Sequence, residues 1–218
     1  GGYDSFATGD YSTVSGGYES EATGYASTIS GGYENIAPGY KSTIGGGGEN
    51  YASGKFSTIG GGYKNDASGY GAVIAGGGYW SENESYNEAT GEYFPTVGGG
   101  SGNYATDSFA TISGGYQNEA TGGGSTVSGG GGNAASGNYS TVGGGQSNDA
   151  TGYYSTVGGG SRNLASGYNS TVGGGAYNAA SGSYATVGGG YQNQASRDGS
   201  TVGGGTNNSA SGSPQAFS

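Results

Sequence analysis

A 15-residue repeat runs through the whole sequence and constrains its fold more than any other feature. A Ser-Thr-Val tripeptide, or a near match, begins at residues 12, 27, 42, 57, 72, 95, 110, 125, 140, 155, 170, 185 and 200. The step is 15 residues everywhere except for one step of 23. The 218 residues therefore divide into 14 units, which cover 1–75, one long unit at 76–98 with eight extra residues, and 99–218. We expect a single repeat domain over 1–218.

Some positions of the repeat are held far more strictly than others. The consensus is G-G-Y-x-N-x-A-S-G-x-Y-S-T-V-G, with Gly at positions 1 and 2 and Ala at position 7 in all 14 units. Position 14 is Val or Ile in 13 units, and positions 5 and 13 are Asn and Thr in 12 units each. Positions 4, 6 and 10 vary and hold most of the charge. A disordered linker has no reason to keep the same residue at the same repeat position, which we call a column. We therefore expect the chain to fold into an ordered structure despite its 57 Gly residues.

The length and content of the repeat predict an all-β parallel β-solenoid (a β-roll) of 14 coils, with 15 residues per coil and an 8-residue insertion in one coil. Fifteen residues are too few for a helical-pair repeat. Positions 11–14, as in Tyr139-Ser140-Thr141-Val142, favour a strand bounded by Gly. Alternation along that strand directs positions 14 and 12 to one face and positions 13 and 11 to the other.

The two invariant apolar columns predict the core. Val or Ile at position 14 and Ala at position 7 should face each other inside the coil, as represented by Ala135, Val142, Ala150, Val157, Ala165 and Val172. The Gly run at positions 15, 1 and 2 should turn the chain through positive φ angles, and Ser/Thr-Gly at positions 8 and 9 should form the second corner. Asn at position 5 is expected to tolerate a left-handed backbone and to stack into a side-chain ladder.

The thin core predicts self-association. One buried Val contributes about 1.5–3 kcal/mol, whereas ordering each residue costs about 1–2 kcal/mol. Another buried face would offset this difference. We expect that face to lie at position 13, and its candidate interface residues are Thr126, Thr141, Thr156 and Thr171. The predicted partner is a second copy of the chain, in a homo-oligomer (a trimer is favoured) or in an end-to-end filament.

The run A-S-G-x-Y-S-T-V-G-G-G-x-x-N-x-A-S-G resembles the YadA-like (Hep_Hag) head repeat of trimeric autotransporter adhesins, and the likeness covers all 218 residues. The shared features are Ala at position 7, Gly at position 9, the strand that ends in Val or Ile at position 14, and Gly at position 15. The repeat is 15 residues long here, against about 14 in the family, and the strand reads S-T-V rather than V-A-I. The resemblance implies a left-handed parallel β-roll, a trimer, and adhesion by a long surface or tail-fibre-like protein.

The composition excludes several function classes. Cys and His are absent, so the usual ligands of zinc, haem and iron–sulfur centres are missing, as are Cys–His and Ser–His catalytic pairs. We predict that the chain is not an enzyme and has no catalytic, cofactor-binding or metal site. The net charge of −10 argues against nucleic acid as a partner. No apolar run is long enough to cross a bilayer, so we expect no membrane insertion.

The long unit holds the candidate contact site for a partner. Its extra residues fall mainly at 78–84, and the candidate contact residues are Tyr79, Trp80, Glu82, Glu84 and Tyr86. Flat aromatic faces beside carboxylates suit a glycan or another surface ligand. The alternatives are a tolerated surface loop, since insertions in repeat proteins map to loops, and a structural cover for the roll. In every case we expect the insertion to bulge from one side of the roll and the repeat to resume in register after it, at Asn87, Ala89, Gly91 and Val97.

These observations predict a non-catalytic structural fibre or adhesin-like head segment, located outside the cell or on its surface, that serves attachment or matrix formation. One alternative is an ice- or carbohydrate-binding solenoid that acts through a flat Thr or Tyr face. A third interpretation is a segment of a phage-type tail fibre. The 21 Tyr residues fit either a sticky face or a structural role in which stacked rings cover the glycine surface.

Overall fold

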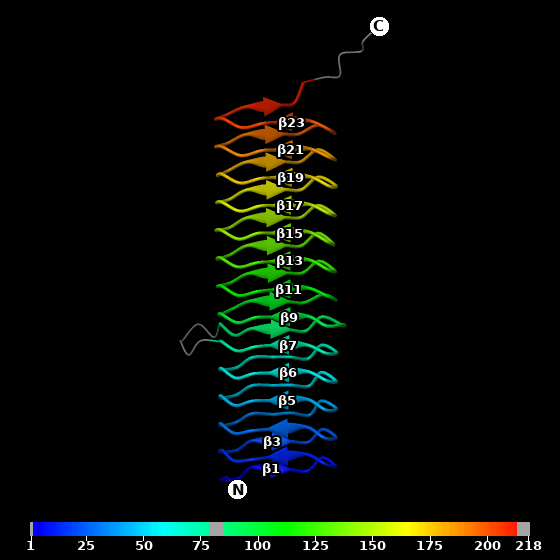
Figure 1. The fold of residues 1–218 in the computed structure, drawn as a ribbon, viewed down its shortest axis with the longest axis vertical. Helices are drawn as coiled ribbons and strands as arrows, with labels where there is room; N and C mark the ends of the chain where they lie inside the picture. Colours follow the sequence, from blue (N-terminus) through cyan, green and yellow to red (C-terminus); the bar gives the residue numbers. More distant parts are fainter. Residues whose placement is uncertain (1, 79–84, 213–218) are drawn as a thin grey trace. The chain divides into compact units, whose positions relative to one another are not determined.

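The computed structural model describes residues 2–78 and 85–212 and confirms an all-β parallel solenoid of about 13 turns that repeat every 15 residues or so. No helix occurs within these described ranges. The chain divides into two units, Gly1–Gly124 and Ser125–Ser218. In each unit the strands lie one above the next (Figure 1).

All strands are two residues long. The first unit contains β1 (Phe6–Ala7), β2 (Thr13–Val14), β3 (Glu21–Ala22), β4 (Thr28–Ile29), β5 (Thr43–Ile44), β6 (Thr58–Ile59), β7 (Val73–Ile74), β8 (Glu88–Ala89), β9 (Thr96–Val97), β10 (Tyr104–Ala105), β11 (Thr111–Ile112) and β12 (Glu119–Ala120). The second unit contains β13 (Thr126–Val127), β14 (Ala134–Ala135), β15 (Thr141–Val142), β16 (Asp149–Ala150), β17 (Thr156–Val157), β18 (Leu164–Ala165), β19 (Thr171–Val172), β20 (Ala179–Ala180), β21 (Thr186–Val187), β22 (Gln194–Ala195), β23 (Thr201–Val202) and β24 (Ser209–Ala210).

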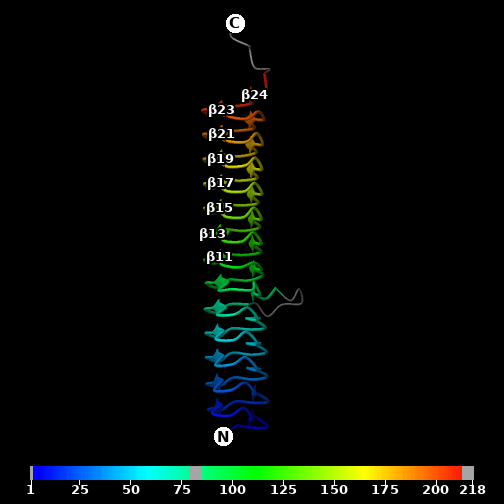
Figure 2. The same cartoon turned by 90° about the vertical axis from the view of Figure 1, so that its right-hand side faces the viewer.

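Most coils contribute a strand to each of two parallel sheets. Positions 13 and 14 form one sheet, in which Thr141 pairs with Thr156 and Val142 with Val157. Positions 6 and 7 form the other sheet, in which Ala135 pairs with Ala150; at Ile36, Tyr51 and Asp66 it is reduced to isolated bridges. Figure 2 shows β13, β15, β17, β19, β21 and β23 aligned within the second unit. The register places each residue beside its equivalent one repeat away.

The core lies between the two sheets, where the sequence predicts it. The six representative residues Ala135, Val142, Ala150, Val157, Ala165 and Val172 are fully buried. Ser at position 12 is buried with them, as Ser140 and Ser155 illustrate. Burial of these two positions repeats through both units, except in the first and last coils, because each coil directs Val or Ile and Ala to the interior.

The predicted Asn ladder is present, but the left-handed residue lies one position earlier than expected. Asn148 Nδ2 donates to Asn133 Oδ1 at 3.2 Å and to the carbonyl oxygens of Gly144 and Gly160 at 2.9 Å each. The prediction of a left-handed conformation at position 5 was wrong, because Ser147 at position 4 has the positive φ of 53°. The side chain at position 4 points outward and is free to vary, whereas Asn at position 5 is buried and bonded between coils.

The glycine corner is confirmed and its glycines are sterically required. Gly145, at position 2, has a φ of 91°. A Cβ atom on this residue would lie 2.1 Å from the carbonyl oxygen of Gly160 in the next coil and 2.8 Å from Asn148 Nδ2. Real Cβ atoms do not approach a backbone oxygen this closely, so only Gly allows the coils to stack here.

The second corner lies later in the coil than predicted, and the strand before Val is correspondingly shorter. In the coil of Tyr139, the Ser140 amide donates to the carbonyl of Gly137 at 3.0 Å, which closes a β-turn. Tyr139 has a φ of 56°, so position 11 lies in the turn and not in a strand. The expected strand over positions 11–14 is therefore reduced to positions 13 and 14, and the expected corner at positions 8 and 9 extends to position 11.

The repeat keeps its register across the long unit. Val73 pairs with Thr96 and Ile74 with Val97, although 23 residues separate each pair. The Asn ladder also continues, because Asn87 Nδ2 donates to the side chain of Asn65 at 3.1 Å. The described coils on either side of the insertion therefore stack in register, as the phase of the sequence predicts.

Candidate functional site

The predicted contact site falls largely outside the described residues. Tyr79, Trp80, Glu82 and Glu84 all lie in the gap at 79–84. Tyr86 is described, and its ring meets the edge of the Tyr104 ring with centroids 6.4 Å apart. The nearby Glu88 carboxylate raises the pKa of Tyr86, since ionising the phenol would place two negative charges together. A contact role for this segment stays a prediction.

The predicted interface residues form one row on an outer face. Thr126, Thr141, Thr156 and Thr171 are partly exposed and lie in register on consecutive strands of the second unit. Within the described part of the second unit no second row of Thr flanks them, because position 11 holds Tyr, Asn or Gly there and lies in the turn. Association through this face stays a prediction, since only one chain is described.

A stripe of aromatic rings follows the corner at positions 10 and 11. We call the row of rings in the first unit the aromatic stripe. It consists of Tyr11, Tyr25, Tyr40, Phe56, Tyr70, Tyr93, Phe94 and Phe109. Tyr25 and Tyr40 stack with centroids 5.1 Å apart and planes 6° apart. Tyr40 and Phe56 then meet edge to face at 5.7 Å. Each ring therefore packs against the ring of the next coil, and the contacts run without interruption from Tyr11 to Phe109.

The rings of the aromatic stripe remain open to solvent. Their exposed fractions range from 36% for Tyr70 to 80% for Tyr11. Lys55 lies over this stripe, with Nζ 5.0 Å from the centroid of Tyr40 and 5.1 Å from that of Phe56. Aromatic rings that are packed on one another and still exposed form a continuous apolar surface along the corner.

The second unit carries a shorter stripe of the same kind. Its rings are Tyr139, Tyr153, Tyr154, Tyr168 and Tyr184. Tyr139 stacks on Tyr154 at 5.2 Å. The sequence analysis allowed for stacked tyrosine rings but did not locate either stripe, because it treated positions 10 and 11 as separate columns. Both positions belong to one turn, so a ring at either position reaches the same corner, and counting the two columns together would have revealed the stripe.

An acidic groove lies on another side of the first unit. Position 4 carries Asp4, Glu19, Glu34 and Glu49 on four successive coils. Together with Asn50 and the position-6 residues Phe6, Glu21, Ile36 and Tyr51, they line a groove of about 820 Å³. The sequence places most of its charge at positions 4, 6 and 10. The structure aligns four of these carboxylates in one row, because every position 4 recurs at the same place on the coil.

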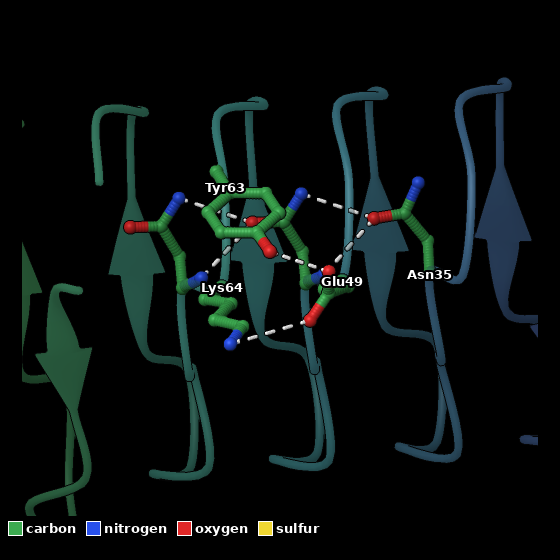
Figure 3. Close-up of polar contacts among 6 residues, drawn as sticks. Asn35, Glu49, Tyr63 and Lys64 are labelled. Atoms are coloured by element: carbon green, nitrogen blue, oxygen red, sulfur yellow. Dashed lines mark hydrogen bonds and ion pairs between the residues drawn. The ribbon is translucent and has the colours of Figure 1, made fainter. Parts of the chain in front are cut away.

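The row of carboxylates ends at a small polar cluster around Tyr63 (Figure 3). The Tyr63 hydroxyl donates to Glu49 Oε1 at 2.5 Å, and Lys64 Nζ lies 3.6 Å from Glu49 Oε2. Glu49 and Lys64 both occupy position 4, on neighbouring coils, and Tyr63 occupies position 3. The hydrogen bond to Glu49 raises the pKa of Tyr63, because it stabilises the protonated phenol beside an anion.

Two other tyrosines have the same kind of partner. The hydrogen bond to Glu19 raises the pKa of Tyr18, and the hydrogen bond to Glu92 raises the pKa of Tyr93. Carboxylates next to phenols therefore recur on this unit.

Among residues 2–78 and 85–212, no group of three acidic, His or Cys side chains is arranged to hold a metal ion. In that same part of the chain, no helix has the length and apolar character needed to cross a membrane.

Comparison with known proteins gives no relative. The sequence matches no family model, and no curated protein matches it. The functional argument therefore depends on the geometry described above.

Proposed function

We propose that the chain is a non-catalytic structural segment of an extracellular fibre, in which the coils hold the aromatic stripe in place for attachment to surfaces. The observation that carries this proposal is the unbroken row of exposed, mutually packed rings from Tyr11 to Phe109. Exposed apolar surface that continues over many residues is typical of an interaction site in a soluble protein.

The framework behind the stripe supports a mechanical role. Each coil is joined to the next by backbone hydrogen bonds and by the buried Asn ladder, as at Asn163, whose Nδ2 donates to Asn148 Oδ1 at 3.1 Å. Rings that pack against such a framework lose little further side-chain freedom when they meet a surface. Preorganisation of this kind lowers the entropic cost of binding.

The packing of the rings on one another leaves few open ring faces. In the stacked pair of Tyr25 and Tyr40, the faces that the two rings turn toward each other are covered. Saccharide units stack on open ring faces, so the alternative of a carbohydrate-binding face has less support. Ice binding through the Thr face also has less support, because the single Thr row has no parallel second row beside it.

We further propose that chains associate through the Thr face, in a trimer as the likeness to adhesin heads implies. The thin core of one Val or Ile and one Ala per coil supports this proposal. Mass measurement in solution tests it with a variant that combines Thr141→Glu and Thr156→Glu. Gln194→Glu on the opposite sheet serves as the control. We expect the paired variant to be monomeric and the control to keep the mass of the wild type; a wild-type monomer would refute the proposal.

The attachment proposal is tested by adsorption to methyl-coated and polysaccharide-coated sensor surfaces. The stripe variant combines Tyr25→Ser, Tyr40→Ser and Tyr70→Ser, which remove rings that are 36–42% exposed. The control combines Tyr18→Ser, Tyr51→Ser and Tyr116→Ser, which remove rings of similar exposure, 41–52%, elsewhere on the same unit.

We expect the stripe variant to lose most of its adsorption to the methyl surface while the control keeps it, with unchanged circular dichroism for both. Equal loss in the two variants would show that attachment depends on total tyrosine content and not on the stripe. Adsorption to the polysaccharide surface alone would favour the glycan-binding alternative.

A further inference from the structure

Three position-3 residues on successive coils form an unusual arrangement. Tyr33 and Tyr63 flank Gly48, which has no side chain. The Tyr33 ring leans over this gap, since a Cβ atom on Gly48 would lie 2.3 Å from Tyr33 Cε1 and 2.9 Å from the Tyr33 hydroxyl oxygen. The rings of Tyr33 and Tyr63 thereby approach each other across two coil steps, with centroids 6.4 Å apart and planes tilted by 37°.

A proton acceptor is already bonded to one of these phenols. The Tyr63 hydroxyl donates to Glu49 Oε1 at 2.5 Å, and Glu49 is held by Lys64 on its other oxygen. When a phenol loses one electron, its hydroxyl proton becomes strongly acidic and must move to a base. A carboxylate at hydrogen-bond distance can accept that proton as the electron leaves, so the radical forms more easily at Tyr63 than at a phenol without such a partner.

Both rings are also accessible. Tyr33 and Tyr63 are partly exposed, and so is the Glu49 carboxylate between them. Rotation about the side-chain bonds of partly exposed rings is fast, so the ortho carbons of two phenoxyl radicals can meet without unfolding the coils.

We propose that Tyr63 is a site of one-electron oxidation and that it couples to Tyr33, which creates a dityrosine cross-link over the coil of Gly48. The oxidant is hydrogen peroxide used by a haem peroxidase. Each tyrosine gives up one electron and its hydroxyl proton, and the proton of Tyr63 passes to Glu49. A carbon–carbon bond forms between the two ortho carbons, and the hydrogens on those carbons then move to the phenol oxygens.

The reaction balances without any other reagent. Two ring C–H bonds break in total, and the two electrons and two protons reduce the peroxide to two molecules of water. The product joins the first and third of three successive coils covalently. This modification does not depend on the proposed attachment function, because neither tyrosine belongs to the aromatic stripe.

The sequence offers a direct readout of the cross-link. Trypsin cleaves after Lys41, Lys55 and Lys64, so Tyr63 is the only tyrosine in the peptide 56–64, and Tyr33 lies in the peptide that ends at Lys41. The purified chain is treated with a haem peroxidase and hydrogen peroxide, denatured and digested. We expect a joined peptide whose mass is the sum of these two peptides less two hydrogen atoms, and fragmentation should place the link at Tyr33.

Three variants separate the proposal from random oxidation. Glu49→Gln keeps the size of the side chain but weakens the acceptor, and should slow formation of the joined peptide by about tenfold or more. Gly48→Ala fills the space that the Tyr33 ring occupies and should abolish the joined peptide. Glu34→Gln removes a carboxylate from the same row and should leave the yield unchanged.

Two results would overturn the proposal. One is a Glu49→Gln variant that cross-links at the rate of Glu34→Gln. The other is a wild-type digest in which peptide 56–64 is unlinked or is joined equally to many tyrosine peptides. Circular dichroism of each variant before oxidation shows whether the coils are intact, and a loss of the joined peptide counts only in a folded variant.

Discussion

Replacing Asn148 with Ala tests the Asn ladder on which the stacking of coils depends. The two N–H bonds of Asn148 Nδ2 lie within hydrogen-bond distance of three acceptors, and its Oδ1 accepts from both the backbone amide and the side-chain amide of Asn163 at 3.0 and 3.1 Å. Asn148 and Asn163 are almost completely buried. The substitution therefore removes both side-chain N–H donors and the Oδ1 acceptor from the interior, and leaves the Asn163 N–H without its acceptor.

The expected loss can be estimated from these contacts. An unsatisfied buried donor costs about 1–3 kcal/mol, and each lost hydrogen bond contributes about 0.5–1.5 kcal/mol net. Several partners of Asn148 keep another bond; for example, the Gly160 carbonyl still accepts from the Gln146 amide at 2.9 Å. We therefore expect Asn148→Ala to lower the free energy of unfolding of the second unit by about 3–5 kcal/mol.

Urea unfolding followed by circular dichroism measures this change, with Gln194→Ala as the matched control. Gln194 also carries a side-chain amide in the second unit, but its side chain is exposed. The control should change stability by about 0.5 kcal/mol or less. A loss below about 1 kcal/mol for Asn148→Ala, similar to the control, would show that the ladder contributes little and that the reasoning is wrong.

Three further predictions concern the core, the glycine corner and the response to pH. Val142→Asp should unfold the coils around it, because an unpaired carboxylate would be buried. Thr141→Asp lies on the outer face and should be tolerated in the monomer. Hydrogen exchange of the backbone amides in these coils distinguishes the two variants. Gly145→Ala should destabilise the second unit by about 2 kcal/mol or more, since its Cβ would lie 2.1 Å from a carbonyl oxygen of the next coil, whereas Gly203→Ala has open space and should be nearly neutral in urea unfolding. Burial raises the pKa of Asp66, because the charged carboxylate is poorly solvated in the folded chain. Asp66 therefore contributes stability to the folded state at pH below the ordinary carboxyl pKa, and this contribution is lost as pH rises through the raised pKa. We expect the melting temperature of the first unit to rise as pH falls from 7 toward 4, and to rise less in Asp66→Asn.

The sequence alone predicted the parts of the fold that depend on repeat positions where the residue type hardly varies. Val or Ile at position 14 and Ala at position 7 are the invariant apolar residues, so they could be assigned to the core before any coordinates existed, and residues such as Val142 and Ala135 are indeed buried. The Asn column predicted a ladder for the same reason. Strict identity at a position indicates that no other side chain satisfies both the packing and the hydrogen bonds there.

The backbone conformations were harder to predict than the columns. Non-Gly residues seldom adopt positive φ angles, so nothing in the side chains of Tyr139 or Ser147 indicates that positions 11 and 4 are left-handed. The hydrogen bonds between coils impose this conformation: the Tyr154 amide donates to the carbonyl of Asn138 at 3.0 Å, and the Arg162 amide donates to that of Gln146 at 2.9 Å. Local preference is overridden by the repeated contacts of the stack.

The positions of the aromatic stripe and of the Tyr63 cluster could not be predicted for a related reason. The aromatic stripe uses two positions of the repeat that the turn brings to one corner, and the Tyr63 cluster joins residues that are 14 and 15 positions apart. Both depend on knowing which side chains of neighbouring coils point in the same direction. That information follows from the turn at positions 9–11 and from the left-handed residue at position 4, and neither could be read from the order of residues.

The central claim, that each coil is stacked in register one repeat from the next through the Asn column, can be measured most directly by NMR. A scalar coupling through the hydrogen bond between the Asn163 amide nitrogen and the side-chain carbonyl carbon of Asn148 reports this contact alone. The structure predicts a detectable coupling, together with slow exchange of the Asn163 amide, because the N–O distance is 3.0 Å and both residues are buried. An Asn163 amide that exchanges freely with solvent, or that couples to a different carbonyl group, would contradict the proposed stacking.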